Sequence, residues 1–568
     1  MVTRSLRALA VTAGILSAPF APAPAMAQSA RTDAGPYLAA RAAAAAQDYE
    51  AAADWFETAL GADPRNPALL EGAIGGLLAS GEAEAAMPLA ERLRETGAPS
   101  PVANMLLQID AAKRGDWDEI FDLLEAGHGV GPLADGLTRA WARLGQGRMD
   151  QALSAFDEVI ETPGLSGFGL YHKALALAVA GDLSAAEAIL AAAPENGLPL
   201  SRQVVTAHAR ILGRLDRHEE ALALLDRVGR GDAILGALRT RLAQDPDATL
   251  DDVTTAVEGL SDLYVSVAGA LGNETPGAFA LLYARAALAL DPDRVEALLV
   301  TAQLLERAGR MDLAQQAYAE VPEDHPAHVT AELGRAAALR RAGEPGRALE
   351  VLEQLSRAAP ELAEVQVAIG DLQRARGDVA AAEAAYSAAL DLAGEDAAWW
   401  LYYMRGIARH EQDDWPGAEA DFRAALEIDP DRAEVLNFLG YSLVERGEAL
   451  DEALDMIERA VRSQPDNGAI VDSLGWAQFK LGRYEEAVGH LERAAELEPV
   501  DPVVNDHLGD GYWAVGRQTE ARFQWQRALS FEPAPEEASR IRAKLEKGLD
   551  AVIAAEGGVP LRQVAGGQ

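Results

Sequence analysis

Three short motifs in the chain contain residue types that are used in binding. Arg-Gly-Asp triplets cover residues 114–116, 230–232 and 376–378, and such triplets suggest an adhesion function. The first and the third fall at expected turns between two helices, where Gly-Asp is ordinary turn chemistry. A glycine-rich run covers residues 127–131, but a phosphate-binding loop needs a preceding strand, and none is expected there. We interpret these motifs as turns and loops.

The remaining candidates for chemistry are histidines and paired carboxylates. His325 and His328 lie in a proline-bounded turn without a nearby carboxylate ligand, which does not favour a metal site. Asp413-Asp414 and Glu485-Glu486 precede expected helices, where acidic residues interact well with the helix N-terminus. The chain has no cysteine, which excludes thiol catalysis, disulfides and cysteine-ligated metals. We therefore predict no enzyme, no catalytic residue, no cofactor and no metal.

The charge of the chain restricts its partners. Its 568 residues include 50 Lys and Arg against 89 Asp and Glu, a formal net charge of −39. Nucleic acids and anionic membrane surfaces require clustered cations, so neither is expected as the main partner. An acidic surface instead favours solubility and attracts basic proteins.

The first 27 residues have the pattern of a secretory signal peptide. Arg4 and Arg7 precede an apolar stretch at residues 8–20, and Ala25-Met26-Ala27 provides a small-residue cleavage site. We expect export to the periplasm or cell envelope and no stable membrane insertion after cleavage. Retention of this segment as an anchor is the alternative, so the sequence leaves cleavage open.

A repeat of about 34 residues organises most of the chain, and it is clearest near the C-terminus. Gly406 and Gly440 are 34 residues apart, Gly440 and Gly475 are 35 apart, and Gly475 and Gly509 are 34 apart. Glycine inside a helix costs about 1 kcal/mol, so its recurrence indicates that a second helix approaches closely. The small partners expected at that crossing are Ala418, Ala453, Ala487 and Ala521. The side chains expected to fill the space between repeats are Phe422, Ile457, Leu491 and Trp525.

This pattern of Leu-Gly, alanine, a bulky apolar residue, alanine and proline resembles the tetratricopeptide repeat (TPR). The resemblance implies an all-α fold, an α-solenoid in which helix-turn-helix repeats form a right-handed superhelix. The predicted organisation is a signal peptide (1–27), an N-terminal degenerate TPR array (28–230), a divergent helical segment (231–275), a middle TPR array (276–398), well-matched repeats (399–535), a capping helix (536–556) and a disordered tail (557–568). The divergent segment is either a non-TPR insert or a hinge.

In TPR superhelices the first helix of each repeat lines a concave groove, and the resemblance assigns repeat positions to it. The candidate partner-binding residues in this groove are Tyr403, Asn437, Tyr441, Asp472, Trp476, Phe479, Asp506 and Trp513. Aromatic anchors beside amide and carboxylate groups are typical of peptide recognition. The alternative is that several of these aromatic residues belong to the core of the solenoid.

The C-terminal block is similar to that of bacterial envelope TPR proteins, among them lipoprotein adaptors that partner a periplasmic C-terminal-processing protease. Those adaptors carry a lipidated cysteine, which this sequence lacks. The resemblance implies a protein-binding adaptor or scaffold in the envelope, with an envelope protease and its substrates as possible partners. The alternative is a structural scaffold of an envelope assembly or of a polysaccharide or protein export machine.

Overall fold

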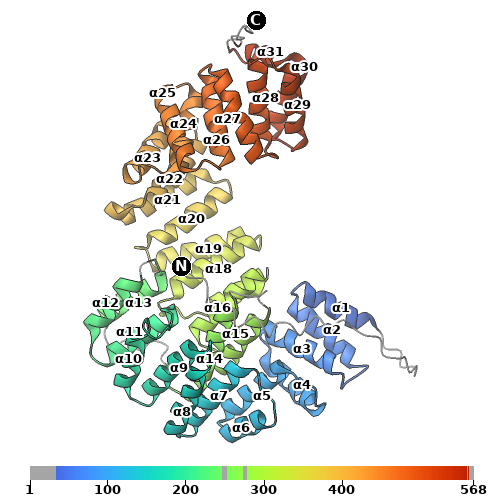
Figure 1. Cartoon of the computed structure of the whole chain (residues 1–568), viewed down its shortest axis with the longest axis vertical. Helices are drawn as coiled ribbons and strands as arrows, with labels where there is room; N and C mark the ends of the chain where they lie inside the picture. Colours follow the sequence, from blue (N-terminus) through green and yellow to red (C-terminus); the bar gives the residue numbers. More distant parts are fainter. Residues whose placement is uncertain (1–33, 230, 246–252, 273–277, 559–560, 562–568) are drawn as a thin grey trace. The chain divides into compact units, whose positions relative to one another are not determined.

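The computed structural model describes residues 34–229, 231–245, 253–272, 278–558 and 561. In these residues the chain consists of α-helices, one short 3-10 helix and the turns between them, without a β-strand (Figure 1). The predicted all-α solenoid is therefore confirmed. The expected signal peptide at residues 1–27 lies outside the described residues, as does most of the tail expected at residues 557–568.

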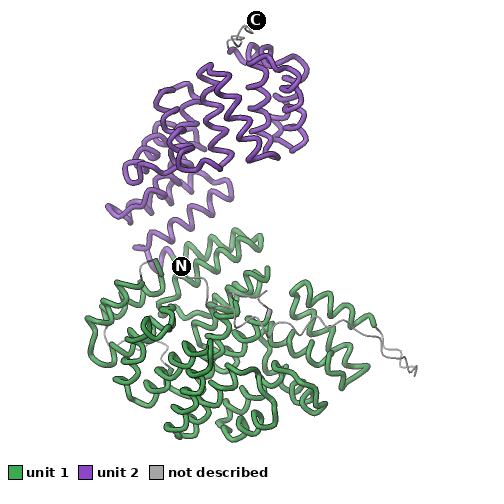
Figure 2. The backbone as a smooth tube through the Cα atoms, in the orientation of Figure 1, with its two compact units in different colours: residues 1–355 green, residues 356–568 purple. Residues whose placement is uncertain are grey.

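The chain divides into two compact units, residues 1–355 and residues 356–568 (Figure 2). We call them unit 1 and unit 2. The helices that begin in unit 1 are α1 (Ala34–Ala45), α2 (Tyr49–Leu60), α3 (Pro67–Ser80), α4 (Ala83–Glu95), α5 (Pro101–Arg114), α6 (Trp117–Glu125), α7 (Pro132–Gly145), α8 (Met149–Glu161), α9 (Ser166–Val179), α10 (Leu183–Ala191), α11 (Arg202–Arg214), α12 (His218–Val228), α13 (Ala233–Gln244), α14 (Ala256–Gly272), α15 (Ala278–Leu290), α16 (Val295–Arg307), α17 (Met311–Ala319), α18 (His328–Arg341) and α19 (Pro345–Ala358).

The helices of unit 2 pack in consecutive pairs, such as α22 with α23 and α26 with α27. They are α20 (Ala363–Ala375), α21 (Val379–Ala393), the 3-10 helix η2 (Gly394–Asp396), α22 (Trp399–Glu411), α23 (Trp415–Ile428), α24 (Ala433–Arg446), α25 (Leu450–Ser463), α26 (Gly468–Lys480), α27 (Tyr484–Leu497), α28 (Pro502–Ala514), α29 (Gln518–Ser530), α30 (Pro535–Lys547) and α31 (Leu549–Ala555). None of the helices in the described part of the chain has the length and apolar character that crossing a bilayer requires.

Aspartates start several of the second helices of these pairs. Asp116 accepts a hydrogen bond from the backbone N–H of Glu119 at 3.1 Å, and Asp378 accepts one from Ala381 at 3.2 Å. Asp414 caps α23 in the same way. Such caps satisfy backbone N–H groups that have no partner inside the helix. All three Arg-Gly-Asp triplets thus end in an aspartate that caps a helix, since Asp232 caps α13 in the same way.

The recurring glycines allow close packing within each repeat. A Cβ atom at Gly509 would lie 2.4 Å from Trp525 Cδ1, and one at Gly475 would lie 2.7 Å from Leu491 Cγ. The expectation that glycine permits close helix approach is confirmed. The atoms that fill the space above these glycines, however, belong to the large side chains that we had placed between repeats. The reason is that an aromatic or leucine side chain reaches across the helix pair, whereas alanine is too short.

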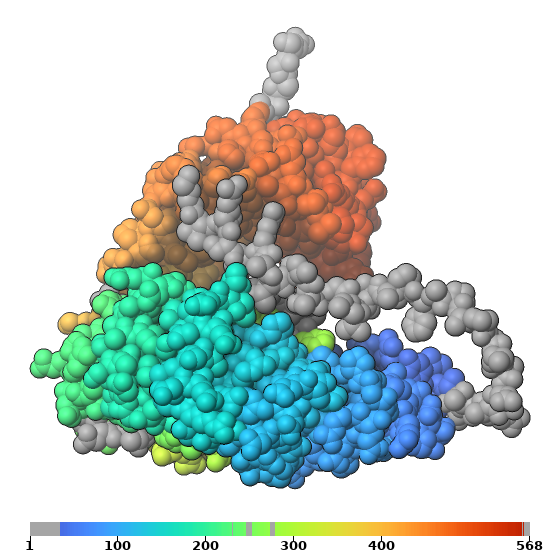
Figure 3. Space-filling view, turned by 60° about the horizontal axis from the view of Figure 1, so that its bottom comes forward, coloured from blue at the N-terminus to red at the C-terminus, as the bar shows by residue number. Residues whose placement is uncertain are grey.

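A helical hairpin, α14 and α15, packs inside unit 1. Helix α14 contacts α7, α9 and α16, and α15 contacts α3, α4 and α5, which lie far away in the sequence. Arg285 on α15 donates a hydrogen bond from Nε to the carbonyl oxygen of Ala79, at the end of α3, at 3.2 Å. On the face that Figure 3 shows, the residues of unit 1 form a continuous surface that runs from blue through cyan to green.

The divergent segment predicted at residues 231–275 is explained by this hairpin. Its described part contains α13, which packs on α12, and α14, which is buried on nearly all sides. A helix enclosed on all sides loses the one-sided apolar pattern of a repeat helix, so its repeat register cannot be recognised. The choice between a non-TPR insert and a hinge stays a prediction.

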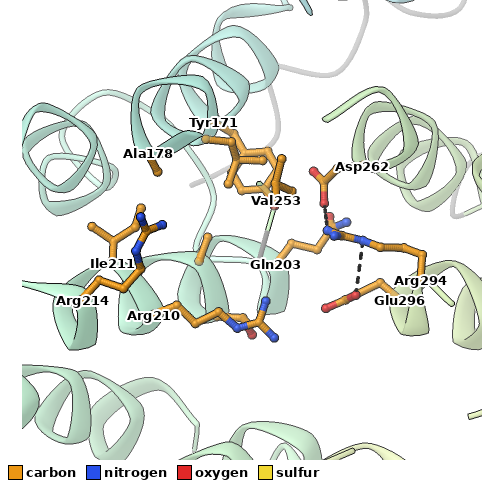
Figure 4. A pocket seen from close by; sticks show the side chains of 13 residues that line it. Tyr171, Ala178, Gln203, Arg210, Ile211, Arg214, Val253, Asp262, Arg294 and Glu296 are labelled. Carbon is orange, nitrogen blue, oxygen red and sulfur yellow. Dashed lines mark hydrogen bonds and ion pairs between the residues drawn. The ribbon is translucent and has the colours of Figure 1, made fainter. Parts of the chain in front are cut away.

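The buried Asp262 of α14 belongs to a charge cluster. Arg294 forms an ion pair with Asp262, which is fully buried, and a longer one of 3.6 Å with Glu296 (Figure 4). Burial raises the pKa of Asp262, while the Arg294 guanidinium lowers it. The adjoining cavity has a volume of about 30 Å³, room for about two water molecules. The cluster therefore anchors α14 and leaves no room for a larger ligand.

The region predicted as a single capping helix, residues 536–556, consists of two helices. Helices α30 and α31 are separated by Gly548, which has a φ of +82°. A Cβ atom at Gly548 would lie 2.6 Å from Trp513 Cζ2. Glycine thus ends α30 and lets the chain pass directly over the indole ring.

Candidate protein-binding groove

The first helices of the unit 2 repeats share an inner face. Helices α24, α26 and α28 pack on their own partner helices and also on one another. All eight groove candidates lie on α22, α24, α26 and α28. In unit 1 the corresponding helices α3, α5, α7 and α9 are contacted by the α14–α15 hairpin. The corresponding face of unit 1 is therefore covered by this hairpin.

An aromatic group links α22 to α24. Tyr403 is half-buried and packs edge-on against Phe438, with ring centroids 6.0 Å apart. Phe438 also contacts Phe422 and His410, at 5.0 and 5.4 Å. Burial raises the pKa of Tyr403, so its hydroxyl stays protonated. Tyr403 is thus part of a core contact and still has a solvent-facing side.

Trp476 lies at the centre of a stack between α26 and α28. Its indole is stacked on Phe479 at 4.9 Å and on His507 at 3.9 Å, and only 5% of Trp476 is exposed. Its Nε1 donates a hydrogen bond to Glu445 on α24, and the Lys480 amine lies 5.1 Å from the ring centroid. Trp476 and Phe479 therefore join repeats and present little surface to a partner.

His507, which stacks on Trp476, also has the Asp472 carboxylate as a partner. His507 Nδ1 lies 2.7 Å from Asp472 Oδ2, and both side chains are buried. Burial by itself lowers the pKa of His507, but the charges of Asp472, Asp506 and Asp510 outweigh it, so the pKa is raised. In its protonated form the imidazole makes a buried ion pair with the Asp472 carboxylate next to Trp476.

The C-terminal cap uses two further groove candidates. Lys544 on α30 is fully buried, and its Nζ lies 2.6 Å from Asp506 Oδ2 and 2.7 Å from Asp510 Oδ2. Trp513 is 8% exposed, and its Nε1 donates to Asp550 on α31 at 2.9 Å. The structure thus places Trp513 and part of Asp506 beneath the cap.

Three equivalent positions on successive helices carry a buried oxygen that lacks a partner. Oδ1 of Asn437 on α24, of Asp472 on α26 and of Asp506 on α28 is inaccessible to solvent and accepts no hydrogen bond within the described residues. An unsatisfied buried acceptor costs about 1–3 kcal/mol. Because these three oxygens are inaccessible to solvent, they are not presented to a segment bound on the surface.

The structure divides the eight candidates into two groups. Tyr403, Asn437, Tyr441 and Asp506 are half-buried on the inner face, and the buried residues are Asp472, Trp476, Phe479 and Trp513. Sequence reasoning missed Glu445, which accepts from Trp476. Glu445 lies four residues after Tyr441 and hence on the same helix face, which was the signal that could have found it.

Nothing in the described residues forms a cluster of three potential metal ligands. His325 Nδ1 accepts from the backbone of Ala327 at 3.0 Å, and His328 Nδ1 lies 3.3 Å from the Val321 carbonyl oxygen. Nδ1 of each imidazole thus contacts the backbone of its own turn.

The profile of the tetratricopeptide repeat family matches more than half of the chain. It covers residues 137–198, 280–329, 333–397, 367–433, 403–468, 439–502 and 473–538. The chain belongs to the tetratricopeptide repeat family. Such repeats generally mediate protein–protein interactions, and a TPR solenoid is typically a non-catalytic scaffold.

The relatives of this TPR protein match it over short segments. A TPR repeat-containing protein of Pseudomonas aeruginosa is 36% identical over 83 residues, 15% of this chain and 14% of its own length. Bacteriophage adsorption protein A of Escherichia coli K12 is 30% identical over 80 residues, 14% of this chain and 8% of its own length. The matched segments thus span only a small part of these relatives.

Solved structures resemble the chain over longer stretches at low identity. The APC/C hetero-tetramer Cut9-Hcn1 aligns with a TM-score of 0.37 and 17% identity, covering 92% of this chain and 97% of that chain. A tetratricopeptide repeat protein from Parabacteroides merdae aligns with a TM-score of 0.36 and 16% identity, covering 44% of this chain and 97% of that chain.

Proposed function

We propose that this TPR protein is an exported adaptor of the bacterial cell envelope that holds an extended segment of a partner protein on the inner face of unit 2. The observation that carries the proposal is the set of half-buried side chains Tyr403, Asn437 and Tyr441 on helices α22 and α24, which the contact of Tyr403 with Phe438 links. An extended peptide can pack its side chains on the two tyrosines and form a hydrogen bond with the exposed part of Asn437.

The net charge of the chain favours a neutral or basic segment. Asp472, Asp506 and Glu445 lie along the inner face but pair with His507, Lys544 and Lys480, so the preference rests on the net charge of −39 of the whole chain. Complementary charge raises association rates and selects among partners. A segment with lysine or arginine beside apolar residues therefore fits better than an acidic one.

The test begins with affinity purification of the exported protein, with crosslinking and mass spectrometry to find partners and crosslinked positions. The double variant Asn437→Ala and Tyr441→Ala is then compared with Tyr37→Ala, a change at an exposed tyrosine of unit 1. We expect the double variant to bind the partner at least tenfold more weakly than wild type. The Tyr37→Ala control should bind as wild type does. Unchanged binding by the double variant would rule out the groove. The buried Trp476 is unsuitable, because its removal would disturb folding.

The envelope location is supported by the composition of residues 1–27 and is tested separately. A fusion of residues 1–40 to a reporter that is active only after export should be active, and cell fractionation should find the protein in the envelope or periplasm. A protein found in the cytoplasm would refute the location without affecting the groove. An envelope protease among the crosslinked partners would support the adaptor role. A secretion or polysaccharide-export complex in its place would favour the scaffold alternative.

A further inference from the structure

Unit 1 contains a large cleft that the repeat pattern does not require. It lies between the start of α4 and helix α5 on one side and helices α15 and α17 on the other, and its volume is about 1080 Å³. Pockets that bind small molecules usually measure about 300–1000 Å³. The cleft is therefore large enough for a short peptide segment.

The cleft has an apolar floor and a charged rim. The floor is made by Met87, Leu106, Ile109, Leu288, Ala289, Leu313 and Ala317. The rim carries charges of both signs, the acidic Glu82, Glu84, Asp110 and Glu320 and the basic Lys113 and Arg114. Burial of apolar side chains of a ligand on this floor would supply about 25 cal/mol per Å².

Arg285 lies in this cleft with its charge uncompensated. Its Nε is fixed by the carbonyl oxygen of Ala79, and no carboxylate of the described residues lies within ion-pair distance. Burial lowers the pKa of Arg285. The charges of Glu320 and Tyr49 raise this pKa, but by less than burial lowers it. A Cβ atom at Gly81 would lie 3.2 Å from Arg285 Nη1, so glycine keeps the space beside the guanidinium free.

Two other arginines of unit 1 with low exposure have carboxylate partners. Arg310 pairs with Asp312 at 2.6 Å, and Arg294, just before α16, pairs with Asp262 of α14. A buried charge without a partner is costly, and a guanidinium recognises a carboxylate through two parallel hydrogen bonds. Arg285 thus has a fixed orientation and hydrogen-bond donors that remain available to a ligand.

We propose that this cleft is a second protein-binding site, which takes a short apolar peptide segment with one acidic side chain that pairs with Arg285. The segment is otherwise apolar, because the floor is apolar and the rim has charges of both signs. This site lies within unit 1, does not depend on the unit 2 groove, and would remain if the groove assignment failed.

The test uses a phage library of random octapeptides selected on the immobilised full chain. Two variants are compared with wild type: Arg285→Gln, which removes the charge, and Ala289→Trp, which fills the floor. The matched control is Arg307→Gln, since Arg307 also donates to a backbone carbonyl, that of Gly272 at 3.0 Å, but lies outside the cleft. Circular dichroism and thermal melting identify any variant that has lost its fold.

We expect the selected peptides to share one acidic residue among apolar ones. Loss of one charge-assisted hydrogen-bonded pair should weaken binding of a synthetic copy about tenfold or more in Arg285→Gln. Ala289→Trp should weaken it similarly, and Arg307→Gln should bind as wild type. Selected peptides without an acidic residue, equal binding by Arg285→Gln, or no enrichment would overturn the proposal. Binding of decanoate that depends on Arg285, without peptide binding, would also overturn it in favour of a small carboxylate.

Discussion

Replacing Lys544 by methionine tests whether the C-terminal cap is held by a buried charge pair. Lys544 is fully buried, and the Asp510 side chain opposite it is 1% exposed. Methionine keeps the length and most of the apolar stem but removes the charge. Because Asp510 would then be buried without its cation, we expect a loss of about 3–5 kcal/mol in the free energy of unfolding of unit 2.

The assay is urea unfolding followed by tryptophan fluorescence, since the Lys544 amine lies 5.9 Å from the Trp525 ring centroid. Lys547→Met is the matched control, because Lys547 is exposed on the same helix and should change stability by less than about 0.5 kcal/mol. Adding Asp510→Asn to Lys544→Met should recover a substantial part of the loss, since the uncompensated charge is then gone.

The pH dependence of Lys544→Met gives an independent check. Burial already raises the pKa of Asp510, and loss of Lys544 raises it further. A carboxyl with a raised folded-state pKa stabilises the fold below its unfolded pKa, and this contribution is lost as pH rises through the folded value. The deficit should therefore be smaller at pH 5 than at pH 8. An equal effect of both lysine variants, or a deficit independent of pH, would refute the reasoning.

Two further predictions concern the packing of unit 2. The pKa of His507 is raised above 6.5, so its ion pair is fully stabilising below that pH and is lost as pH rises through the folded value. The urea midpoint should fall between pH 6 and 9 in wild type and fall less in His507→Gln, and parallel profiles would contradict this. Gly509→Ala should destabilise by about 1–3 kcal/mol, because the new methyl group meets a buried indole. Gly489→Ala should stabilise by up to about 1 kcal/mol, because its site is open, and similar effects in both would show that packing is not limiting.

The inner face of unit 2 illustrates how far the repeat pattern reaches. The 34-residue period places Asn437, Asp472 and Asp506 at equivalent positions, and the structure shows that each has an oxygen without a partner. The period does not distinguish Tyr441, which is half-buried, from Trp476, which is buried in a stack. Burial depends on the neighbouring repeat: His507 covers Trp476, and that contact joins residues that the period treats as independent.

The α14–α15 hairpin makes contacts that the sequence pattern does not predict. A repeat array is expected to have contacts between neighbouring repeats only. In unit 1, however, Arg285 contacts Ala79 across some two hundred positions of the chain. Such contacts leave no periodic signal, because one helix meets several repeats at once.

The sequence by itself determined the helix pairs, the repeat and the inner helices of unit 2, because glycine, alanine and proline act locally at fixed spacing. Only the tertiary structure decided that the α14–α15 hairpin packs on the other helices of unit 1 and that Lys544 holds the C-terminal cap on unit 2. It also decided which aromatic residues stay accessible. These outcomes depend on contacts between residues distant in the chain. Their free energies come from burial and charge pairing, which have no period.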